Sequence, residues 1–350
     1  MDRSSEKEAL ITHVAEPKPV TVSPSKHDKR SLAVLCLILF LGSITLTLQY
    51  HFQGPLARPS VGRSLDRRSP NFYGASNVTG FSNDIVPNMV HLIRLDQTLL
   101  SFWDAVCIRS IYLNHNPTLI LIHCSPCGME GPYESWVSDI PTLRQVPIQV
   151  PEDVFGLKLG CVQHVSDVLR IRVLMEHGGI YLDNDVFVVR SMDRFRRFEM
   201  SLGWPEGAYI GNQIQIAHPK ARFLRLYHDL YRRYDKSKWY WNAGDLPTLT
   251  ILIPHQHLVH RSYRSFGVAT YLLDWLYVPK LWLDWTLATA VHLFVHHRGG
   301  NKRDPLKDAP VNETNVGLYD TAIGEMARSV LYGTKKFVEA GAQVLNLSLL

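Results

Sequence analysis

The sequence predicts an α/β protein with a mainly parallel sheet, preceded by one transmembrane helix. After residue 86, short apolar runs of strand length alternate with longer segments of helical periodicity. Near the amino end lies a long apolar segment without charged residues. Of the 350 residues, 46% are hydrophobic and 20% charged, which supports a large core and excludes a disordered or fibrous chain. The net charge of +5 is too small to predict nucleic-acid binding.

The apolar segment at residues 31–50 is predicted to be a membrane signal-anchor. No charged side chain occurs between Arg30 and Arg58, and roughly 20 apolar residues in a helix span the hydrocarbon core of a bilayer. A cleaved signal peptide is the alternative, but such peptides normally have a charged leader of only a few residues. Residues 1–30 are then a cytosolic tail, residues 51–85 a flexible stem rich in Ser, Arg, Gly and Pro, and residues 86–350 a lumenal domain.

The orientation of the chain in the membrane rests on N-glycosylation sequons. Basic residues flank both ends of the anchor and do not decide the question. Sequons at Asn77, Asn312 and Asn346 all follow the anchor, and none precedes it. We therefore expect a single-pass type II protein whose carboxyl-terminal body is lumenal.

Four cysteines follow the anchor, and an even number in an oxidising compartment predicts one or two disulfides. The sequence leaves their pairing open. Cys124 and Cys127 have a spacing found in zinc sites, but a tetrahedral site needs two more ligands and no second close pair exists. The four are Cys107, Cys124, Cys127 and Cys161.

Within the domain, strands are predicted at residues 89–93, 118–122 and 179–189, and helices at residues 102–113 and 163–177. Strands interleaved with helices indicate a layered fold with a mainly parallel sheet. Ligands of such sheets bind beyond the carboxyl ends of the strands, so the chemistry is expected there.

The stretch from Ser166 to Met192 places polar residues at such a strand end. Asp167 and Arg170 lie three residues apart, on one face of the predicted helix. Two glycines end that helix, and the next strand runs into Asp183-Asn184-Asp185. Two carboxylates in an apolar context are costly unless a cation compensates them, and oxygen ligands favour Mn²⁺ or Mg²⁺.

Each of these signals alone has an ordinary structural explanation. An Asp-x-Asp triplet is common in solvated loops, and Asp167 with Arg170 can form a surface ion pair. Their order is more specific: a helix with Asp-x-x-Arg, a Gly-Gly break, a strand and Asp-x-Asp resembles the sugar-nucleotide site of DXD glycosyltransferases with a GT-A fold. Over about residues 87–219 the chain is similar to glycosyltransferase family 32, which includes α-1,4-galactosyl-, α-1,4-N-acetylglucosaminyl- and initiating α-1,6-mannosyltransferases.

The resemblance implies a GT-A type, Rossmann-like layered domain and roles for particular residues. By this likeness Asp167 and Arg170 bind hydroxyls of the donor sugar. Asp183 contacts ribose and the metal, and Asp185 binds the metal. Further residues implied in donor or metal binding are His91, Leu92 and Ile93 in the opening strand, Tyr181 and Asn184 beside the acidic pair, Asn212 facing the transferred sugar, and His292 near the metal and diphosphate.

Two departures from the family pattern concern positions next to these residues. Arg94 stands where many relatives have Trp, and the segment after His292 lacks the Trp that relatives usually have. That segment instead contains His296, His297 and Arg298, which are candidates for contact with a diphosphate.

The predicted function is that of a retaining glycosyltransferase of the Golgi membrane. It would move galactose or N-acetylglucosamine from a nucleotide sugar, with a UDP-sugar favoured, to a glycan, glycolipid or glycoprotein hydroxyl, using Mn²⁺ or Mg²⁺. No residue stands out as a covalent nucleophile, which favours a front-face route. Two alternatives stay open: a catalytically inert lumenal binding protein of the same fold, and a metal-dependent phosphodiester or pyrophosphate hydrolase.

Overall fold

The structure is a computed structural model that describes residues 72, 77–304, 307–339 and 341–349. The chain divides into two units, Met1–Ser64 and Leu65–Leu350, and the described residues belong to the second. The predicted tail, the predicted anchor at residues 31–50 and most of the predicted stem lie outside the described residues. Among those described, no helix has the length and apolar character needed to cross a bilayer.

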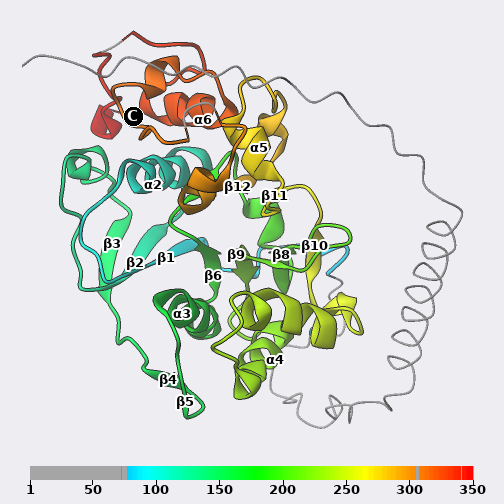
Figure 1. Ribbon diagram of the computed structural model, residues 1–350. Helices are drawn as coiled ribbons and strands as arrows, with labels where there is room; N and C mark the ends of the chain where they lie inside the picture. Colours follow the sequence, from blue (N-terminus) through cyan, green and yellow to red (C-terminus); the bar gives the residue numbers. More distant parts are fainter. Residues whose placement is uncertain (1–71, 73–76, 305–306, 340, 350) are drawn as a thin grey trace, which may run out of the picture. The chain divides into compact units, whose positions relative to one another are not determined.

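A seven-stranded mixed sheet forms the centre of the domain (Figure 1). Its strands β6, β1, β2 and β3 are mutually parallel, which confirms that part of the predicted sheet. Strand β9 is antiparallel to both β6 and β8, so the sheet is less uniformly parallel than predicted. In spatial order the strands are β10 (His260–Ser262), β8 (Met200–Gly203), β9 (Gly211–Ala217), β6 (Gly179–Leu182), β1 (Met89–Leu95), β2 (Leu119–Ser125) and β3 (Leu143–Pro147).

The single strand predicted at residues 179–189 is interrupted. The turn at Asp183-Asn184-Asp185 separates β6 from β7, and the Asp183 N–H donates to the Gln213 carbonyl at 3.0 Å. After the turn the chain enters a second sheet in the order β11 (Phe266–Gly267), β12 (Ala290–His292) and β7 (Val186–Val188). The acidic turn therefore lies where the chain passes from one sheet to the other. A separate two-stranded hairpin joins β4 (Asp153–Val154) to β5 (Leu157–Lys158).

Helices cover both faces of the large sheet (Figure 1). One face carries α3 (Val162–His177) and α4 (Arg222–Leu230), with α3 against β1 and β6. On the other side, α2 (Phe102–His115) packs against β7 and α6 (Ala322–Leu331), and α6 contacts α5 (Leu272–Tyr277). Short 3₁₀ helices span Glu134–Trp136, Asp193–Phe195, Tyr231–Arg233, Gln256–Leu258, Trp285–Leu287, Val295–Gly300, Val316–Leu318 and Leu347–Leu349, and π-helical turns span Trp241–Asp245 and Thr248–Leu252.

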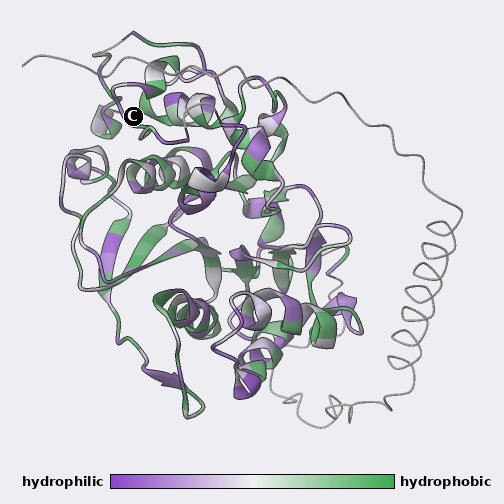
Figure 2. Cartoon of the chain, in the orientation of Figure 1, coloured by the Kyte–Doolittle hydropathy of each residue, from purple (hydrophilic) through white to green (hydrophobic). Residues whose placement is uncertain are grey.

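The core follows from the strand pattern. Figure 2 shows β2 as mostly hydrophobic, whereas β3, at the edge of the sheet, contains a hydrophilic stretch at Arg144 and Gln145. Such a difference is expected between a central strand with two covered faces and an exposed edge strand. Residues with no exposed surface from adjacent strands include Val90, Ile120, Ile122, Ile180, Ile214 and Ile216.

The glycine pair after α3 sets how closely the helix end approaches β1. Gly178 has a φ of 66° and Gly179 a φ of 111°, which L side chains rarely adopt. A Cβ at Gly179 would lie 2.7 Å from the Met89 carbonyl oxygen and 2.8 Å from Nε2 of His91. Glycine is therefore required for β6 to begin directly beside β1.

The start of α2 is fixed beside the carboxyl end of β1. Ser101 and Asp104 form a capping box, in which each side chain accepts a hydrogen bond from the other residue's backbone N–H. Arg94 at the end of β1 is buried, pairs with Asp104 at 3.0 Å and donates to the Leu99 carbonyl at 2.8 Å. Arg94, where the family resemblance has Trp, thus serves to join strand and helix.

The described part of the predicted stem is packed on the domain. The Phe81 N–H donates to the Arg197 carbonyl at 2.8 Å, and the Ile85 N–H donates to the Arg196 carbonyl at 3.0 Å. Asn77 is only 5% exposed, and its Nδ2 donates to the His257 carbonyl at 2.9 Å. This burial argues against the glycan predicted on Asn77, because a glycan attached to Nδ2 would have to occupy the space of these contacts.

One disulfide is present among the described cysteines, between Cys124 and Cys127 after β2. Cys107 and Cys161 are free thiols. The sequence predicted one or two disulfides, and the described residues contain one. Cys124 and Cys127, whose spacing resembles that of a zinc site, are bonded to each other.

Two buried histidines, His91 on β1 and His123 on β2, contact each other beside the end of α3. His91 has no exposed surface, its Nε2 lies 2.9 Å from the Gly178 carbonyl and its Nδ1 lies 3.0 Å from Nε2 of His123. The proton of His91 therefore resides on Nε2, and Nδ1 accepts from His123. Burial, reinforced by the neighbouring imidazole, lowers the pKa of His91 to about 3, and burial lowers the pKa of His123 to about 4.

We predict that Arg109→Met destabilises the domain by about 2–4 kcal/mol. Arg109 on α2 is 1% exposed and donates to the carbonyls of Trp136, Val330 and Leu345 at 2.7–3.1 Å. Its loss leaves three backbone acceptors without a donor. Urea unfolding of this variant beside Arg232→Met, whose side chain is 63% exposed, measures the difference. Equal stability of the two variants would contradict the role assigned to Arg109.

We predict a stability that falls as the pH decreases below about 6.5, in part because of His91. Its pKa of about 3 in the folded protein is below the ordinary histidine value of 6.5, so the unfolded chain binds its proton first as the pH falls. One such imidazole changes the free energy of unfolding by up to about 1.4 kcal/mol per pH unit in that window. Urea unfolding at pH 7, 6 and 5 should give a shallower pH dependence for His91→Gln than for the wild type. Parallel curves would refute this prediction.

Candidate active site

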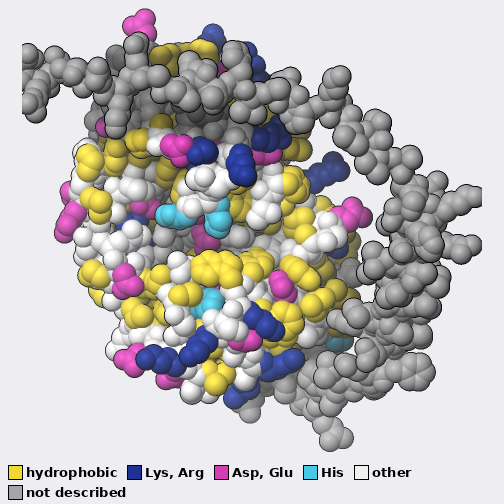
Figure 3. Space-filling view, viewed as in Figure 1, with side chains coloured by type: hydrophobic (Ala, Val, Ile, Leu, Met, Phe, Trp, Pro, Cys, Tyr) yellow, Lys and Arg dark blue, Asp and Glu magenta, His cyan; other side chains and the backbone are white. Residues whose placement is uncertain are grey.

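A cavity of about 540 Å³ lies at the carboxyl ends of β1 and β6, where the fold class predicts a ligand site. Figure 3 shows a hollow on this face, with histidine side chains on opposite rims and an acidic side chain between them. Nine of the eleven residues to which the family resemblance gives a role line the cavity: Ile93, Asp167, Arg170, Tyr181, Asp183, Asn184, Asp185, Asn212 and His292.

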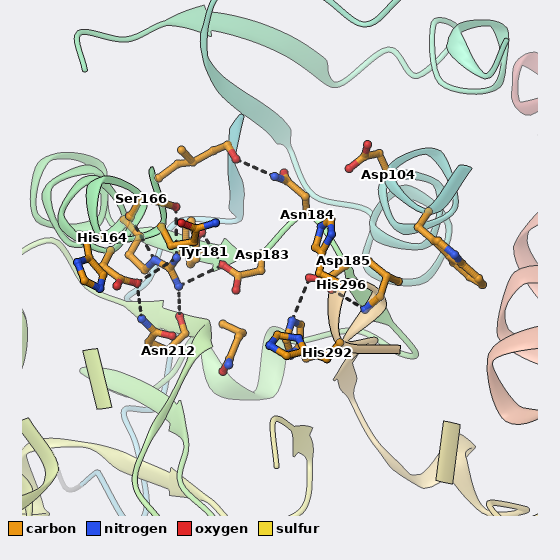
Figure 4. Close-up of a pocket in the computed structure, with 18 of the residues that line it drawn as sticks. Asp104, His164, Ser166, Tyr181, Asp183, Asn184, Asp185, Asn212, His292 and His296 are labelled. Carbon is orange, nitrogen blue, oxygen red and sulfur yellow. Dashed lines mark hydrogen bonds and ion pairs between the residues drawn. The ribbon is translucent and has the colours of Figure 1, made fainter. Parts of the chain in front are cut away.

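At one point of the cavity, two carboxylates and an imidazole converge. Asp183, Asp185 and His292 each offer a ligand atom, and these atoms lie within 4.8 Å of one another (Figure 4). His292 ends β12, which pairs antiparallel with β7, so the register brings it beside the acidic turn. The backbone N–H of Leu293 donates to the Asp185 carbonyl at 2.8 Å, and that of Val295 to Asp185 Oδ2 at 3.2 Å.

Asp185 and His292 lie 3.0 Å apart, from Asp185 Oδ1 to His292 Nε2, and form an ion pair when His292 is protonated. Burial raises the pKa of Asp185, but the charge and hydrogen bond of His292 outweigh this effect and leave the pKa below its usual value. For His292, burial lowers the pKa, and the attraction of Asp185 outweighs burial and leaves it raised. Two carboxylate oxygens and one imidazole nitrogen are a donor set that fits Mn²⁺, so the three residues form a possible divalent-metal site.

Next to this cluster, Arg170 connects α3, the end of β6 and β9. Its guanidinium lies 3.1 Å from Asp183 Oδ1 and 3.2 Å from Asp167 Oδ1, and donates to the Asn212 carbonyl at 3.0 Å. The Asn212 amide donates to Asp167 Oδ1 at 2.7 Å. Burial raises the pKa of Asp167, and Arg170 partly opposes this shift.

Tyr181 contacts two members of this network, Asp183 and Arg170. It is 1% exposed, its hydroxyl donates to Asp183 Oδ1 at 2.7 Å, and the Arg170 guanidinium lies 4.6 Å from the centre of its ring. Its ring is packed in the sheet, while its hydroxyl orients the first carboxylate of the acidic turn.

The opening strand reaches the cavity near its carboxyl end. The side chains of His91 and Leu92 are buried in the core and do not line the cavity, so the part in donor binding that the family resemblance implies for these two residues falls to their backbone. Both faces of this sheet are covered, so side chains within β1 are buried whichever face they point to, and Ile93, which is closer to the carboxyl end of the strand, reaches the cavity. Ile93 lines the cavity, and its carbonyl accepts a hydrogen bond from Asn184 Nδ2 at 2.8 Å.

The segment after His292 is divided between cavity and core. His296 and His297 line the cavity, as the sequence suggested. Arg298 does not line it; its guanidinium is buried and pairs with Asp304 at 2.6 Å. Arg298 is therefore a structural cation and no candidate for contact with a diphosphate.

Several cavity residues were missed in the sequence because they belong to no motif. The aromatic-rich run from Trp239 to Trp241 was the only signal that could have pointed to one of these segments. The missed residues are Gln97, Ser101, Trp103, Asp104, Gln163, His164, Ser166, Gln213, Trp239, Tyr240 and Val295.

Comparisons with solved structures give weak overall likenesses. The PaToxG glycosyltransferase is 18% identical and superimposes with a TM-score of 0.36 over 50% of this chain and 71% of that chain. The galactosyltransferase LgtC in complex with donor and acceptor sugar analogues is 12% identical, with a TM-score of 0.37 over 71% of this chain and 98% of that chain.

Sequence comparisons give a more local match. Glucan organizing enzyme 1 of Cryptococcus neoformans var. grubii serotype A is 30% identical over 152 residues, which cover 40% of this chain and 40% of that protein. The chain thus spans less than half the length of this curated relative. Residues 131–202 match the family described as "Glycosyltransferase sugar-binding region containing DXD motif". That segment holds Asp167, Arg170 and the Asp183-Asn184-Asp185 turn, all of which the structure brings together in the cavity.

Proposed function

We propose that this protein is a metal-dependent retaining glycosyltransferase that moves a hexose from a nucleotide sugar to a hydroxyl of a glycan or glycolipid. One observation carries the proposal. The candidate metal ligands Asp183, Asp185 and His292 adjoin the polar network of Asp167, Arg170 and Asn212 in a single cavity. A metal-bound diphosphate and a hydrogen-bonded sugar need these two kinds of site side by side.

In this proposal, Asp183, Asp185 and His292 hold Mn²⁺ or Mg²⁺. The cation, when bound, neutralises the charge that develops on the departing diphosphate. The protein orients the ligands beforehand: Tyr181 and Arg170 fix Asp183, while the Val295 N–H fixes Asp185. Such support around the ligands reduces the reorganisation needed for binding.

The donor sugar is held by the residues on the other side of Asp183. Arg170 Nη2 and the Asn212 amide both meet Asp167 Oδ1, which leaves the second carboxylate oxygen of Asp167 to accept from a sugar hydroxyl. A sugar fixed in this way presents its anomeric carbon at a constant distance from the acceptor, and this orientation lowers the barrier.

The carboxylates of the cavity favour a front-face reaction. Among the described residues, four Asp side chains line it, and each already has partners: Asp104 with Arg94, Asp167 with Arg170, Asp183 with Tyr181, and Asp185 with His292. These contacts give each carboxylate an orienting role, and in this proposal none of the four acts as a nucleophile. In the proposed step the bond from the anomeric carbon to the diphosphate oxygen breaks, the acceptor oxygen bonds to that carbon on the same face, and its proton passes to the departing phosphate.

The finer assignments rest on the family resemblance and are part of the proposal. We assign the chain to glycosyltransferase family 32, with UDP-galactose or UDP-N-acetylglucosamine as donor and a glycolipid or glycoprotein glycan as acceptor. We further propose a type II protein of the Golgi membrane with a lumenal domain. The Cys124–Cys127 disulfide supports an oxidising compartment.

We predict donor turnover that requires a divalent cation and the acidic turn. The purified protein is tested with a panel of sugar nucleotides in Mn²⁺ or in EDTA, beside Asp185→Asn. The variant removes one charged metal ligand and should reduce kcat/KM by on the order of a hundredfold or more. Asp229→Asn, an exposed residue on α4, is the matched control and should retain activity.

The products separate the proposal from its alternatives. A transferase links the sugar to an added acceptor, whereas a phosphodiester or pyrophosphate hydrolase releases nucleotide at a rate that acceptors do not change. If folded protein binds sugar nucleotides without consuming any, the inert binding protein is the correct interpretation and the transferase proposal fails.

We predict N-glycans on Asn312 and Asn346 and none on Asn77. The sequon hydroxyls of Thr314 and Ser348 already donate to the Oδ1 atoms of Asn312 and Asn346, at 2.6 and 2.7 Å, whereas Asn77 is buried. The protein is expressed in secreting eukaryotic cells, and its gel mobility is compared before and after an N-glycosidase removes the glycans. Asn312→Gln and Asn346→Gln should each lower the apparent mass of the untreated protein by one glycan, and Asn77→Gln should leave it unchanged. A glycan on Asn77 would contradict the packing of residues 77–85.

A further inference from the structure

We propose that Trp239 forms a platform on which the acceptor sugar packs. The inference rests on the proposed transferase function and adds the position and chemistry of the acceptor subsite. It follows from the direction of the cavity, from the way in which Trp239 is held, and from the exposure of its ring.

We take the end of the cavity beyond β1 as the nucleotide end, because the strand order of the sheet reverses there. Strand β1 is hydrogen-bonded to β2 on one side and to β6 on the other, so the order of strands reverses at the β1–β6 boundary. Ligands of open α/β sheets bind at such a reversal, beyond the carboxyl ends of the strands. Gln97, Trp103 and Asp104, which follow β1, line this end.

The opposite end of the cavity is formed by α3, β9 and the segment after α4. In Figure 4, Asp104 and His164 lie on opposite sides of Asp183, with Ser166 and Asn212 on the side of His164. The metal cluster and the Arg170 network lie between the two ends. A donor that places its nucleotide beyond β1 and its diphosphate at the metal cluster therefore directs its sugar toward His164, and the acceptor must approach from that end.

Trp239 is anchored at this end through its backbone. His164 Nε2 lies 3.1 Å from the Trp239 carbonyl, and His164 Nδ1 lies 2.6 Å from the Tyr234 hydroxyl. The next residue, Tyr240, donates its hydroxyl to the Ile210 carbonyl at 2.6 Å. The peptide of Trp239 is thus held by α3 and by the residue that precedes β9.

Trp239 is nevertheless 59% exposed while it lines the cavity. Its ring centre lies 6.0 Å from that of His164, with 42° between the ring planes, so the two rings are not stacked on each other. The apolar ring of an exposed Trp contacts water, and covering it with another apolar surface is favourable. The C–H face of a pyranose is such a surface. Because the backbone of Trp239 is already fixed, binding loses little further backbone entropy.

The surroundings favour a neutral sugar over a second charged ligand. Gln163, His164, Ser166 and Tyr240 share this end of the cavity with Trp239 and offer hydrogen-bonding groups for sugar hydroxyls. The charged groups nearby, Asp167 and Arg170, are paired with each other. An exposed position also suits an acceptor whose remaining glycan extends into solvent.

The test separates acceptor binding from donor binding. Methyl β-D-galactopyranoside, methyl N-acetyl-β-D-glucosaminide and methyl α-D-mannopyranoside serve as acceptor probes, with the donor that the wild type consumes and Mn²⁺. The acceptor KM is measured by transfer, and the donor KM by donor hydrolysis without acceptor. Saturation-transfer NMR of the same glycosides, with UDP and Mn²⁺ present, provides a readout of binding that does not require turnover.

We expect Trp239→Ala to raise the acceptor KM about tenfold or more and Trp239→Phe to raise it about threefold or less. The donor KM should respond instead to Trp103→Ala, at the nucleotide end. Trp275→Ala is the control for loss of an exposed tryptophan, because Trp275 is 41% exposed and does not line this cavity. Thermal unfolding of each variant verifies that it is folded.

An unchanged acceptor KM in Trp239→Ala, or an increase in its donor KM alone, overturns the acceptor platform while the transferase function stands. The platform is likewise overturned if the wild type hydrolyses a donor but neither glycosylates a probe nor gives saturation transfer to one. A wild type that consumes no donor refutes the proposed function itself, and the inference with it.

Discussion

The arrangement of this site depends on one buried cation, the guanidinium of Arg170. It is 5% exposed and lies between two carboxylates, Asp167 and Asp183, so its desolvation is compensated by charge on both sides. Because its partners come from α3 and the end of β6, and its third contact is the Asn212 carbonyl on β9, it fixes three elements with one group. Arg170 thereby sets the position of Asp183, the first carboxylate of the acidic turn.

The sequence predicted those parts of the site that are local in the chain. The periodicity around Asp167, the glycine pair and the acidic turn fall within 19 residues, from Asp167 to Asp185, and the structure brings them together as expected. His292 was assigned from the family resemblance and not from a pattern, because its position depends on the pairing of β7 with β12 across 100 residues. His91 lies on the same face of β1 as Ile93, yet only Ile93 lines the cavity, so the strand pattern alone does not reveal which side chains reach the ligand site.

Other parts of the fold could not be read from the sequence because they depend on tertiary contacts. Arg94 and Arg298 carry the charge expected of ligand-binding residues, yet both are buried in ion pairs that join secondary-structure elements. Charge alone does not distinguish a structural guanidinium from a functional one. Trp239 lies on no strand end and in no motif, and only the packing of His164 and Tyr240 brings it to the cavity.

The chain passes from the large sheet to the second sheet at the acidic turn, so the site depends on strands that follow the motif in the sequence. A product ending before β12 would retain residues 131–202 in full and would still match the sugar-binding region. It would lack His292, the antiparallel neighbour of β7 and the backbone donors to Asp185. A transcript or fragment can therefore carry the complete motif and no complete site, so motif content alone is a poor guide to which isoforms of such a chain are competent.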